Sequence, residues 1–309
     1  MHILLAGGSG LIGTALTRKL LADNHTITVL SRNPDAHSAP QGVRFVRWDG
    51  RSAAGWGSLI DETDAIVNLA GVNLGGGLWT RKRKEALLNS RLLAGQAIMD
   101  ALIQAEKRPE VLVQASAVGY YRTSGDTLLD ESSPPGSDFQ GNLCQRWEGS
   151  TRAAEELGIR RVVIRSGVVF ERGAFILRMF LLPFRMFVGG PIGNGRQYIS
   201  WIHIDDEVNA IVYLINNRVA SGAFNLMSPQ PVRNADLGRM ISRVLRRPYW
   251  FPVPAFAMRL ALGELSSVVL DSWRGVPTRL SDLGFQFAFE NAEPALRDLV
   301  GSGSSSPLV

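Results

Sequence analysis

The first strand and the turn after it constrain this chain more than any other stretch. The sequence from residue 2 to residue 13 is HILLAGGSGLIG, in which residues 3–5 form a short apolar run typical of a central strand buried on both faces. Gly7, Gly10 and Gly13 follow, and apolar residues then recur at helical spacing up to Leu20. Such a turn lets the backbone approach phosphates and points free N–H groups at negative charge. We therefore predict a dinucleotide site here rather than a purely structural turn.

Composition excludes several other classes of protein. The 309 residues carry a net charge of +5, but the basic residues are scattered, and the densest cluster, 81–84, is typical of a solvated helix start. We therefore predict no nucleic-acid partner. The single cysteine, Cys144, excludes an intramolecular disulfide and a cysteine-based metal cluster, and we predict no metal site.

Targeting signals are not apparent in the sequence. Because the first strand begins at residue 2, we expect no signal peptide before it. The longest apolar runs, near 175–188 and 253–263, are interrupted by arginines, so we expect neither to span a bilayer. We predict a cytoplasmic protein without a membrane partner.

The end of the second strand indicates which cofactor fits. Residues 26–30 (TITVL) predict a strand, which runs into Ser31 and Arg32. A carboxylate at this place would accept hydrogen bonds from the adenosine ribose of NAD, whereas a hydroxyl and a guanidinium suit the 2′-phosphate of NADP. We predict NADP(H); the alternative is a surface arginine before a loop.

Further strands and a long helix complete a doubly wound pattern. Strands are predicted at 43–48, 64–69, 111–113, 162–164 and 224–226, in the order that a parallel α/β sheet requires. The fourth of these seven strands runs into Leu69, Ala70 and Gly71, small enough to let the adenosine side of a cofactor lie across the strand ends. A helix is predicted over 81–105, where Arg91 lies one residue off the apolar stripe and within reach of the sheet's carboxyl edge.

Several polar residues lie where ligands of such a sheet bind. Ser116 and Tyr120 follow the 111–113 strand at its carboxyl end. Residues 122–138 predict a loop and 139–157 a helix. His203 is more typical of a structural histidine than of a catalyst, and Asp206 is predicted to cap the helix after it.

The carboxyl-terminal third predicts a separate small lobe. We place a Rossmann-type domain at 1–228, with 170–200 contributing to the substrate lobe, and a mainly helical lobe at 229–300. The glycine loop at 189–197 and the lobe are compatible with a covered small-molecule pocket. Residues 301–309 (GSGSSSPLV) predict a disordered tail.

Several motifs occur together in an order that resembles a known family. The glycine turn, NLAG, the Ser-containing turn ending in tyrosine, RSGVV, and WIHIDD resemble the extended short-chain dehydrogenase/reductases, which are NAD(P)-dependent epimerases and dehydratases. GGPIGNGRQYISWIHIDD, LLPFR and the ending with SPQPVRN and LGF look more closely like the SDR39U1-type epimerase family proteins. Some bacterial members of that subfamily are described as cell-division inhibitor homologues.

The resemblance spans residues 1 to about 299 and implies a Rossmann core with a smaller carboxyl-terminal substrate lobe. It also implies which residues contact NADP, and Arg91 stands where the broader family usually has an asparagine beside the cofactor. The implied contacts are Gly7, Gly10, Leu11, Ile12, Gly13, Ser31, Arg32, Leu69, Ala70, Gly71, Arg91 and Val168.

The usual catalytic pair of that family is missing. Active members carry Tyr-x-x-x-Lys on one helix face, where the Lys charge lowers the pKa of the Tyr that exchanges a proton with substrate. The matching positions here are Phe139 and Leu143, which cannot move a proton, although Ser116 matches the serine that polarises the substrate oxygen.

Two functions therefore remain open at this point. The first is an oxidoreductase or epimerase acting on an unknown small molecule, because hydride transfer is the cofactor's own chemistry. Ser116 and Tyr120 are then the candidate catalytic residues, with Tyr121 or His203 as alternative proton carriers. The second is a catalytically silent NADP(H) sensor that regulates a protein partner. The sequence leaves a homodimer open.

Overall fold

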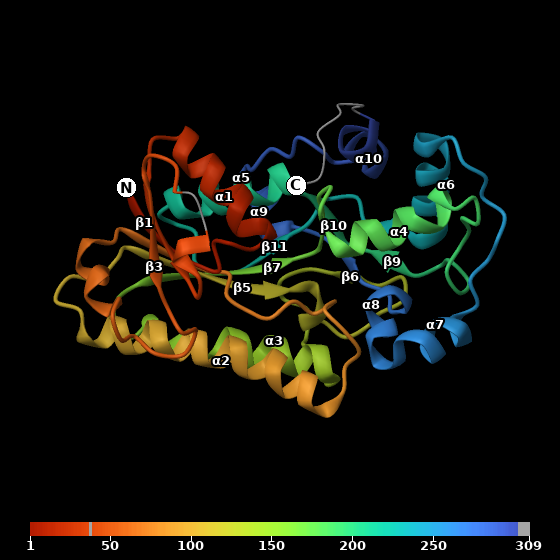
Figure 1. Ribbon diagram of the computed structural model, residues 1–309. Coiled ribbons are helices and arrows are strands. Elements are labelled where there is room, and N and C mark those ends of the chain that lie inside the picture. Colours follow the sequence, from red (N-terminus) through yellow and green to blue (C-terminus); the bar gives the residue numbers. More distant parts are fainter. Residues whose placement is uncertain (37–38, 302–309) are drawn as a thin grey trace.

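A seven-stranded sheet forms the centre of the molecule, and all its strands are parallel (Figure 1). The computed structural model describes residues 1–36 and 39–301. The sheet order is β11-β7-β5-β4-β1-β2-β3. The strands are β1 (His2–Ala6), β2 (Thr26–Ser31), β3 (Val43–Arg47), β4 (Ala65–Asn68), β5 (Val111–Ala117), β7 (Arg160–Ser166) and β11 (Gly222–Leu226).

The chain reverses its direction of winding beside β1. This strand pairs with β2 on one side and with β4 on the other, so Ile3 lies between Ile27 and Ala65. Residues 3–6 have no exposed surface, as expected for a strand covered on both faces. A crevice at the carboxyl ends of the strands is the usual consequence of such a reversal.

Helices cover both faces of the sheet (Figure 1). Helices α1 (Leu11–Ala22) and α5 (Ile204–Asn216) lie on one face, and α2 (Arg81–Gln104) and α3 (Phe139–Gly149) lie on the other. Each face has its own apolar core, built on the first from Leu16 and Ile211 and on the second from Ile98 and Leu102. The two cores fix the helices, and with them the turns that project from the carboxyl edge.

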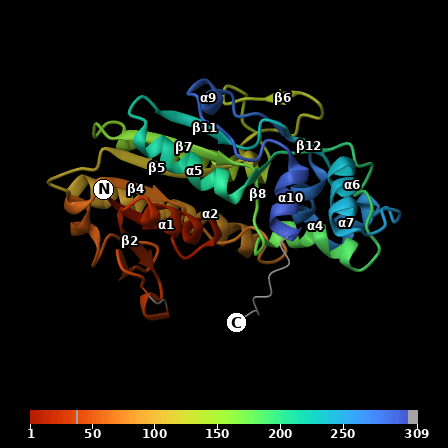
Figure 2. The same ribbon diagram turned by 90° about the horizontal axis from the view of Figure 1, so that it is seen from above.

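The helices of the carboxyl-terminal region gather at one end of the sheet, beyond those carboxyl ends (Figure 2). They enclose a third core with Phe180, Trp201 and Leu296. The helices of this end are α4 (Phe175–Arg185), α6 (Asn234–Leu245), α7 (Ala255–Leu262), α8 (Ser267–Leu270), and α10 (Ala292–Gly301), while α9 (Thr278–Asp282) lies beside β11. The predicted mainly helical lobe is confirmed.

Short elements link these larger ones. The small strands pair as β8 with β10, β9 with β12 and β6 with β13. Their bounds are β6 (Leu128–Leu129), β8 (Val168–Phe170), β9 (Tyr198–Ile199), β10 (Trp201–His203), β12 (Val232–Arg233) and β13 (Arg274–Gly275). Short 3₁₀ helices lie at Pro34–Ala36, Gly57–Glu62, Val118–Tyr120, Arg152–Ala154 and Gly263–Ser266.

Two predicted elements differ from the structure. The helix predicted over 139–157 ends at Gly149, where the Thr151 hydroxyl turns back to donate to Gln114 Oε1 of the sheet. The predicted loop 122–138 contains β6, which pairs with a strand far along the chain and so leaves no local pattern. Of the predicted tail, Gly301 ends α10 and 302–309 lie outside the described residues.

Within the part of the chain that the structure describes, no helix is long and apolar enough to cross a membrane.

Candidate functional site

The turn after β1 is packed so tightly that Gly7 and Gly13 have no room for a side chain. A Cβ on Gly7 would lie 2.7 Å from the carbonyl carbon of Leu69, and one on Gly13 would lie 2.5 Å from the oxygen of Gly7. Gly7 also has a φ of +82°. Gly10 precedes α1 and offers no side-chain cap, so the first N–H groups of the helix are left for another acceptor. This turn fits a diphosphate.

Arg91 supplies a buried positive charge next to Gly71, in the segment after β4 whose Leu69 packs against that turn. Its side chain projects from α2, is 5% exposed, and donates to the carbonyl oxygens of Val72 at 3.2 Å and Leu87 at 2.9 Å. Its guanidinium lies 4.6 Å from the Trp147 ring centre, and its Nε is buried with no partner. Burial lowers the pKa of Arg91 to about 10, which still leaves it charged at neutral pH.

No carboxylate pairs with Arg91 among the described residues. A buried, unpaired cation is costly for a folded protein unless an anion balances it. A ligand phosphate is such an anion, so Arg91 and the glycine turn together fit the pyrophosphate of a dinucleotide.

Ser31 and Arg32 lie at the carboxyl end of β2. The Ser31 hydroxyl accepts a hydrogen bond from the Asn33 N–H at 3.2 Å, and Arg32 is exposed. The next carboxylate along the chain, Asp35, is paired with Arg47 at 2.6 Å. The residues at this strand end therefore offer donors rather than a carboxylate.

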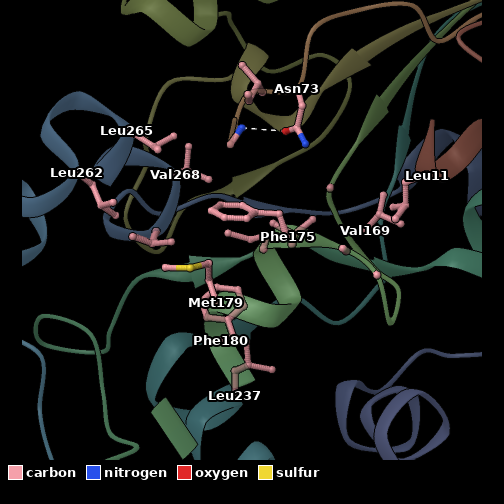
Figure 3. Close-up of a pocket in the computed structure, with 18 of the residues that line it drawn as sticks. Leu11, Asn73, Val169, Phe175, Met179, Phe180, Leu237, Leu262, Leu265 and Val268 are labelled. Carbon is pink, nitrogen blue, oxygen red and sulfur yellow. Dashed lines mark hydrogen bonds between the residues drawn. The ribbon is translucent and has the colours of Figure 1, made fainter. Parts of the chain in front are cut away.

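A cavity of about 640 Å³ joins the glycine turn to the carboxyl-terminal region (Figure 3). Nine of the predicted cofactor contacts line it, while Ser31, Arg32 and Ala70 do not. The nine are Gly7, Gly10, Leu11, Ile12, Gly13, Leu69, Gly71, Arg91 and Val168. The residues that line its far end come from α4, α6, α7 and α8 and are mostly apolar.

The two candidate catalytic residues lie outside this lining. Ser116 is 4% exposed and donates its hydroxyl hydrogen to Glu148 Oε1 at 2.6 Å. Glu148 in turn accepts from Arg165 at 2.9 and 3.0 Å, and the guanidinium of Arg165 lies 3.4 Å from the Tyr120 ring centre. The structure thus brings Ser116 and Tyr120 to one network around Glu148 and Arg165, outside the lining of the cavity. Their catalytic role stays a prediction.

The Tyr121 hydroxyl and one ring nitrogen of His203, the alternative proton carriers, also have hydrogen-bond partners. The Tyr121 hydroxyl donates to Asn225 Oδ1 at 2.7 Å and accepts from Arg165 at 3.0 Å, and burial raises the pKa of Tyr121 to about 12. His203 Nδ1 accepts from the Asp205 N–H as the N-cap of α5, and its ring lies 4.0 Å from that of Phe289.

The prediction that Asp206 caps α5 is wrong. His203 holds that position, and the Asp206 carboxylate accepts from the backbone N–H groups of Ala288 at 2.8 Å and Phe289 at 2.9 Å. Asp206 instead fastens the carboxyl-terminal segment to the helix. The local sequence could not show which N–H groups bind the Asp206 carboxylate, because Ala288 lies more than 80 residues away along the chain.

The residues at the positions that match the family's Tyr and Lys carry no polar group and pack against other side chains. Phe139 and Leu143 both lie on α3. The Phe139 ring packs edge-on against Trp79 at 5.1 Å, with the Lys84 ammonium 5.0 Å from its centre, and Leu143 is 3% exposed.

The described residues contain no group of His, Cys, Asp or Glu side chains that could hold a metal ion.

The sequence predicts a covered pocket at the carboxyl-terminal lobe, but not the residues that line its far end. Residues 170–200 are predicted to contribute to the substrate lobe, and within them the apolar run near 175–188 forms α4, which lines the cavity. Asn73, which follows the NLAG motif, and Asn234 at the start of α6 also line it. The signal available in the sequence was the apolar face of α4, beside the predicted substrate loop.

Comparison with known proteins shows the family to which the chain belongs, and that family agrees with the geometry of the dinucleotide site. Residues 3–227 match the model of the NAD dependent epimerase/dehydratase family, and residues 253–299 match a domain of unknown function, DUF1731. The chain belongs to the NAD dependent epimerase/dehydratase family.

Individual relatives narrow that class. The chain is 37% identical over 305 residues to the chloroplastic SDR39U1 homolog of Arabidopsis thaliana, an epimerase family protein, covering 97% of this chain and 87% of the relative. It is similar to the crystal structure of human SDR39U1 (isoform 2) with NADPH, with a TM-score of 0.88 and 34% identity, covering 98% of this chain and 100% of that one. A nucleoside-diphosphate sugar epimerase from Corynebacterium glutamicum has a TM-score of 0.78 and 28% identity, covering 97% and 58%. The resemblance to SDR39U1-type epimerase family proteins is confirmed.

Proposed function

We propose that this chain is an NADP(H)-dependent oxidoreductase that acts on a small molecule held in the cavity beside its cofactor. The observation that carries this proposal is the continuity of the cavity, which runs from the glycine turn to the carboxyl-terminal helices. A cofactor site that opens into a covered space of this size is typical of enzymes that position a substrate against the cofactor.

The chain's own residues supply binding and orientation. The N–H groups at the start of α1 and the Arg91 guanidinium hold the pyrophosphate. When bound, NADPH supplies a hydride. None of the described lining side chains exchanges a proton at neutral pH, so the chain leaves protonation of the reduced substrate to water.

Ser31 and Arg32 support the choice of NADP over NAD. They lie at the end of β2, where the adenosine ribose of a dinucleotide lies in this fold. A guanidinium binds a phosphate through paired donors. The bound NADPH in the human relative agrees with this choice.

Cofactor binding is tested first, by calorimetry with NADPH and NADH. Arg32→Asp should weaken the binding of NADPH by roughly 10- to 100-fold, which is the contribution of a hydrogen bond to a charged group. It should leave the binding of NADH nearly unchanged. Arg218→Asp is the matched control, because this side chain is 85% exposed and follows α5, before β11. Equal losses of both nucleotides would refute the 2′-phosphate role.

Turnover is tested by following NADPH oxidation with panels of carbonyl compounds and nucleotide sugars. Oxidation that depends on one panel, and that is lost in Gly13→Ala, supports the enzyme. Ser116→Ala and Tyr120→Phe test the catalytic prediction in the same assay. Turnover that both variants retain would refute the catalytic role predicted for those residues and agree with protonation by water.

The second candidate is the silent NADP(H)-binding sensor, and one observation favours it. The usual proton carriers of the family are absent from α3, and the hydroxyls of Ser116 and Tyr121 are engaged in the buried network. Tight NADPH binding with no oxidation on either panel would favour the sensor over the enzyme.

A further inference from the structure

The far end of the cavity has a chemistry of its own. We infer that it takes a lipophilic carbonyl compound with an extended hydrocarbon portion, and not a nucleotide sugar. This inference rests on the proposed function, since it names the substrate class of the same cavity.

Helix α4 forms one wall of this end. Phe180 and Phe184 are 6% and 3% exposed and face the cavity, while Phe175 and Met179 line it and are still 47% and 37% exposed. Figure 3 shows the Phe175 ring between the side chains around it, with Met179 and Phe180 following along the helix. The cavity therefore reaches the surface beside Phe175 and Met179, and its mouth is apolar.

The opposite walls come from three more helices and the turn between two of them. Helix α6 contributes Leu237 and Ile241, both 1% exposed. The segment from α7 to α8 closes the cavity on another side (Figure 3). Its lining residues are Met258, Leu262, Leu265, Val268 and Val269. Apart from two thioethers and two amides, the side chains that surround the space a substrate would occupy carry no polar atom.

Charged and hydrogen-bonding side chains are scarce in the same lining. Among the described residues that form it, Arg91 alone carries a charge, and only Asn73 and Asn234 carry polar amides. Asn73 Oδ1 accepts from the Gly75 N–H at 2.9 Å, and Asn234 Oδ1 accepts from the Ile192 N–H at 2.9 Å. Both amide oxygens are therefore engaged by the backbone.

Arg91 belongs to the cofactor end of the cavity. A Cβ on Gly71, at the end of β4, would lie 3.0 Å from Arg91 Cζ. The diphosphate of a nucleotide sugar would bring two further negative charges into the apolar end, and no described cation there would balance them. Burying an unbalanced charge is strongly unfavourable, whereas burying hydrocarbon is favourable.

The experiment measures binding of 2-hexanone, 2-octanone, 2-decanone and UDP-glucose to the protein saturated with NADP⁺, by calorimetry. The oxidised cofactor prevents turnover of the ketones. Affinity should rise about fourfold per added methylene, or about 16-fold between successive ketones, because each methylene leaves water for an apolar wall. UDP-glucose should bind more weakly than 2-decanone.

A matched pair of variants on α7 locates the binding. Met258 lines the cavity, whereas Leu260, two residues on, is 87% exposed and lies outside the lining. Met258→Gln places an amide of similar size in the cavity and should weaken the binding of 2-decanone by about tenfold. Leu260→Gln should leave 2-decanone unchanged, and both variants should keep the wild-type affinity for NADPH.

Three results would overturn the inference. They are affinities that do not depend on chain length, tighter binding of UDP-glucose than of 2-decanone, and equal effects of Met258→Gln and Leu260→Gln. NADPH binding, measured separately, distinguishes the two proposals. If NADPH binds and the ketones do not, the substrate class is wrong and the cofactor site stands. If NADPH does not bind, the proposed function itself fails.

Discussion

Glu207 allows a quantitative test of the packing between α5 and the sheet. Its side chain has no exposed surface, and among the described residues its only hydrogen-bond partner is the Ser166 hydroxyl, which donates to Oε1 at 2.6 Å. The other oxygen is buried with no partner, and no cation pairs with the carboxyl group among the described residues. Burial raises the pKa of Glu207 from its ordinary value of 4.5 to about 8.

This shift makes the folded state less stable as the pH rises. Between pH 4.5 and about 8 the native protein keeps a proton that the unfolded chain has released, so each pH unit costs about 1.4 kcal/mol of unfolding free energy. From pH 5 to pH 8 the loss amounts to about 3 to 4 kcal/mol. Below pH 4.5 both states hold the proton, and this contribution vanishes.

Glu207→Gln removes the titration while keeping the size of the side chain and an acceptor for Ser166. Urea unfolding of both proteins at pH 5, 6, 7 and 8 should show the variant gaining about 3 to 4 kcal/mol on the wild type across that range. Glu156→Gln, an exposed glutamate, is the control and should show no such gain. A difference between Glu207→Gln and wild type that stays constant with pH would refute the reasoning.

Three further predictions concern the site and its supports. Gly13→Ala should weaken NADPH and destabilise the fold by about 1 to 3 kcal/mol, because the new Cβ would lie 2.5 Å from the Gly7 oxygen; calorimetry and thermal melting check both. Arg91→Met should weaken the binding of NADPH and of NADH alike, by about tenfold, because both nucleotides contain the pyrophosphate. A loss of affinity confined to NADPH would contradict the proposed contact between Arg91 and the pyrophosphate. Asp206→Ala should lower the free energy of unfolding by about 2 kcal/mol, measured in urea, because two N–H groups lose their acceptor; an unchanged midpoint would contradict this.

The sheet could be predicted because its strands carry their own signal. Each of the seven predicted strands is present, and runs such as residues 3–5 and 65–67 are fully buried. A parallel strand covered by helices on both faces needs a continuous apolar run, and that requirement is local in sequence. The end of α3 at Gly149 and the pairing of β6 with β13 depend on distant partners instead, and no local pattern records them.

The candidate site also has one part that local sequence predicts and another part that depends on residues far apart in the chain. The glycine turn and Arg91 could be predicted, because one follows the first strand and the other lies on a helix whose periodicity fixes its face. The apolar end could not, since residues from α4, α6 and α7 meet only when the chain has folded. The network of Ser116, Glu148 and Arg165 was missed for a related reason: it joins one helix and two strands, with its members up to about 50 residues apart.

The core on the α1 and α5 face of the sheet has a consequence for how the protein is made. Leu280 and Phe285 belong to that core, and the Tyr213 hydroxyl donates to the carbonyl oxygen of Leu283 at 2.5 Å. All seven strands are synthesised by residue 226, before the residues that finish covering this face. The nascent chain must hold an incomplete apolar surface until residues 280–285 have left the ribosome. Ribosome-bound intermediates in which residue 226 has emerged and residue 280 has not should consequently be the ones that recruit chaperones.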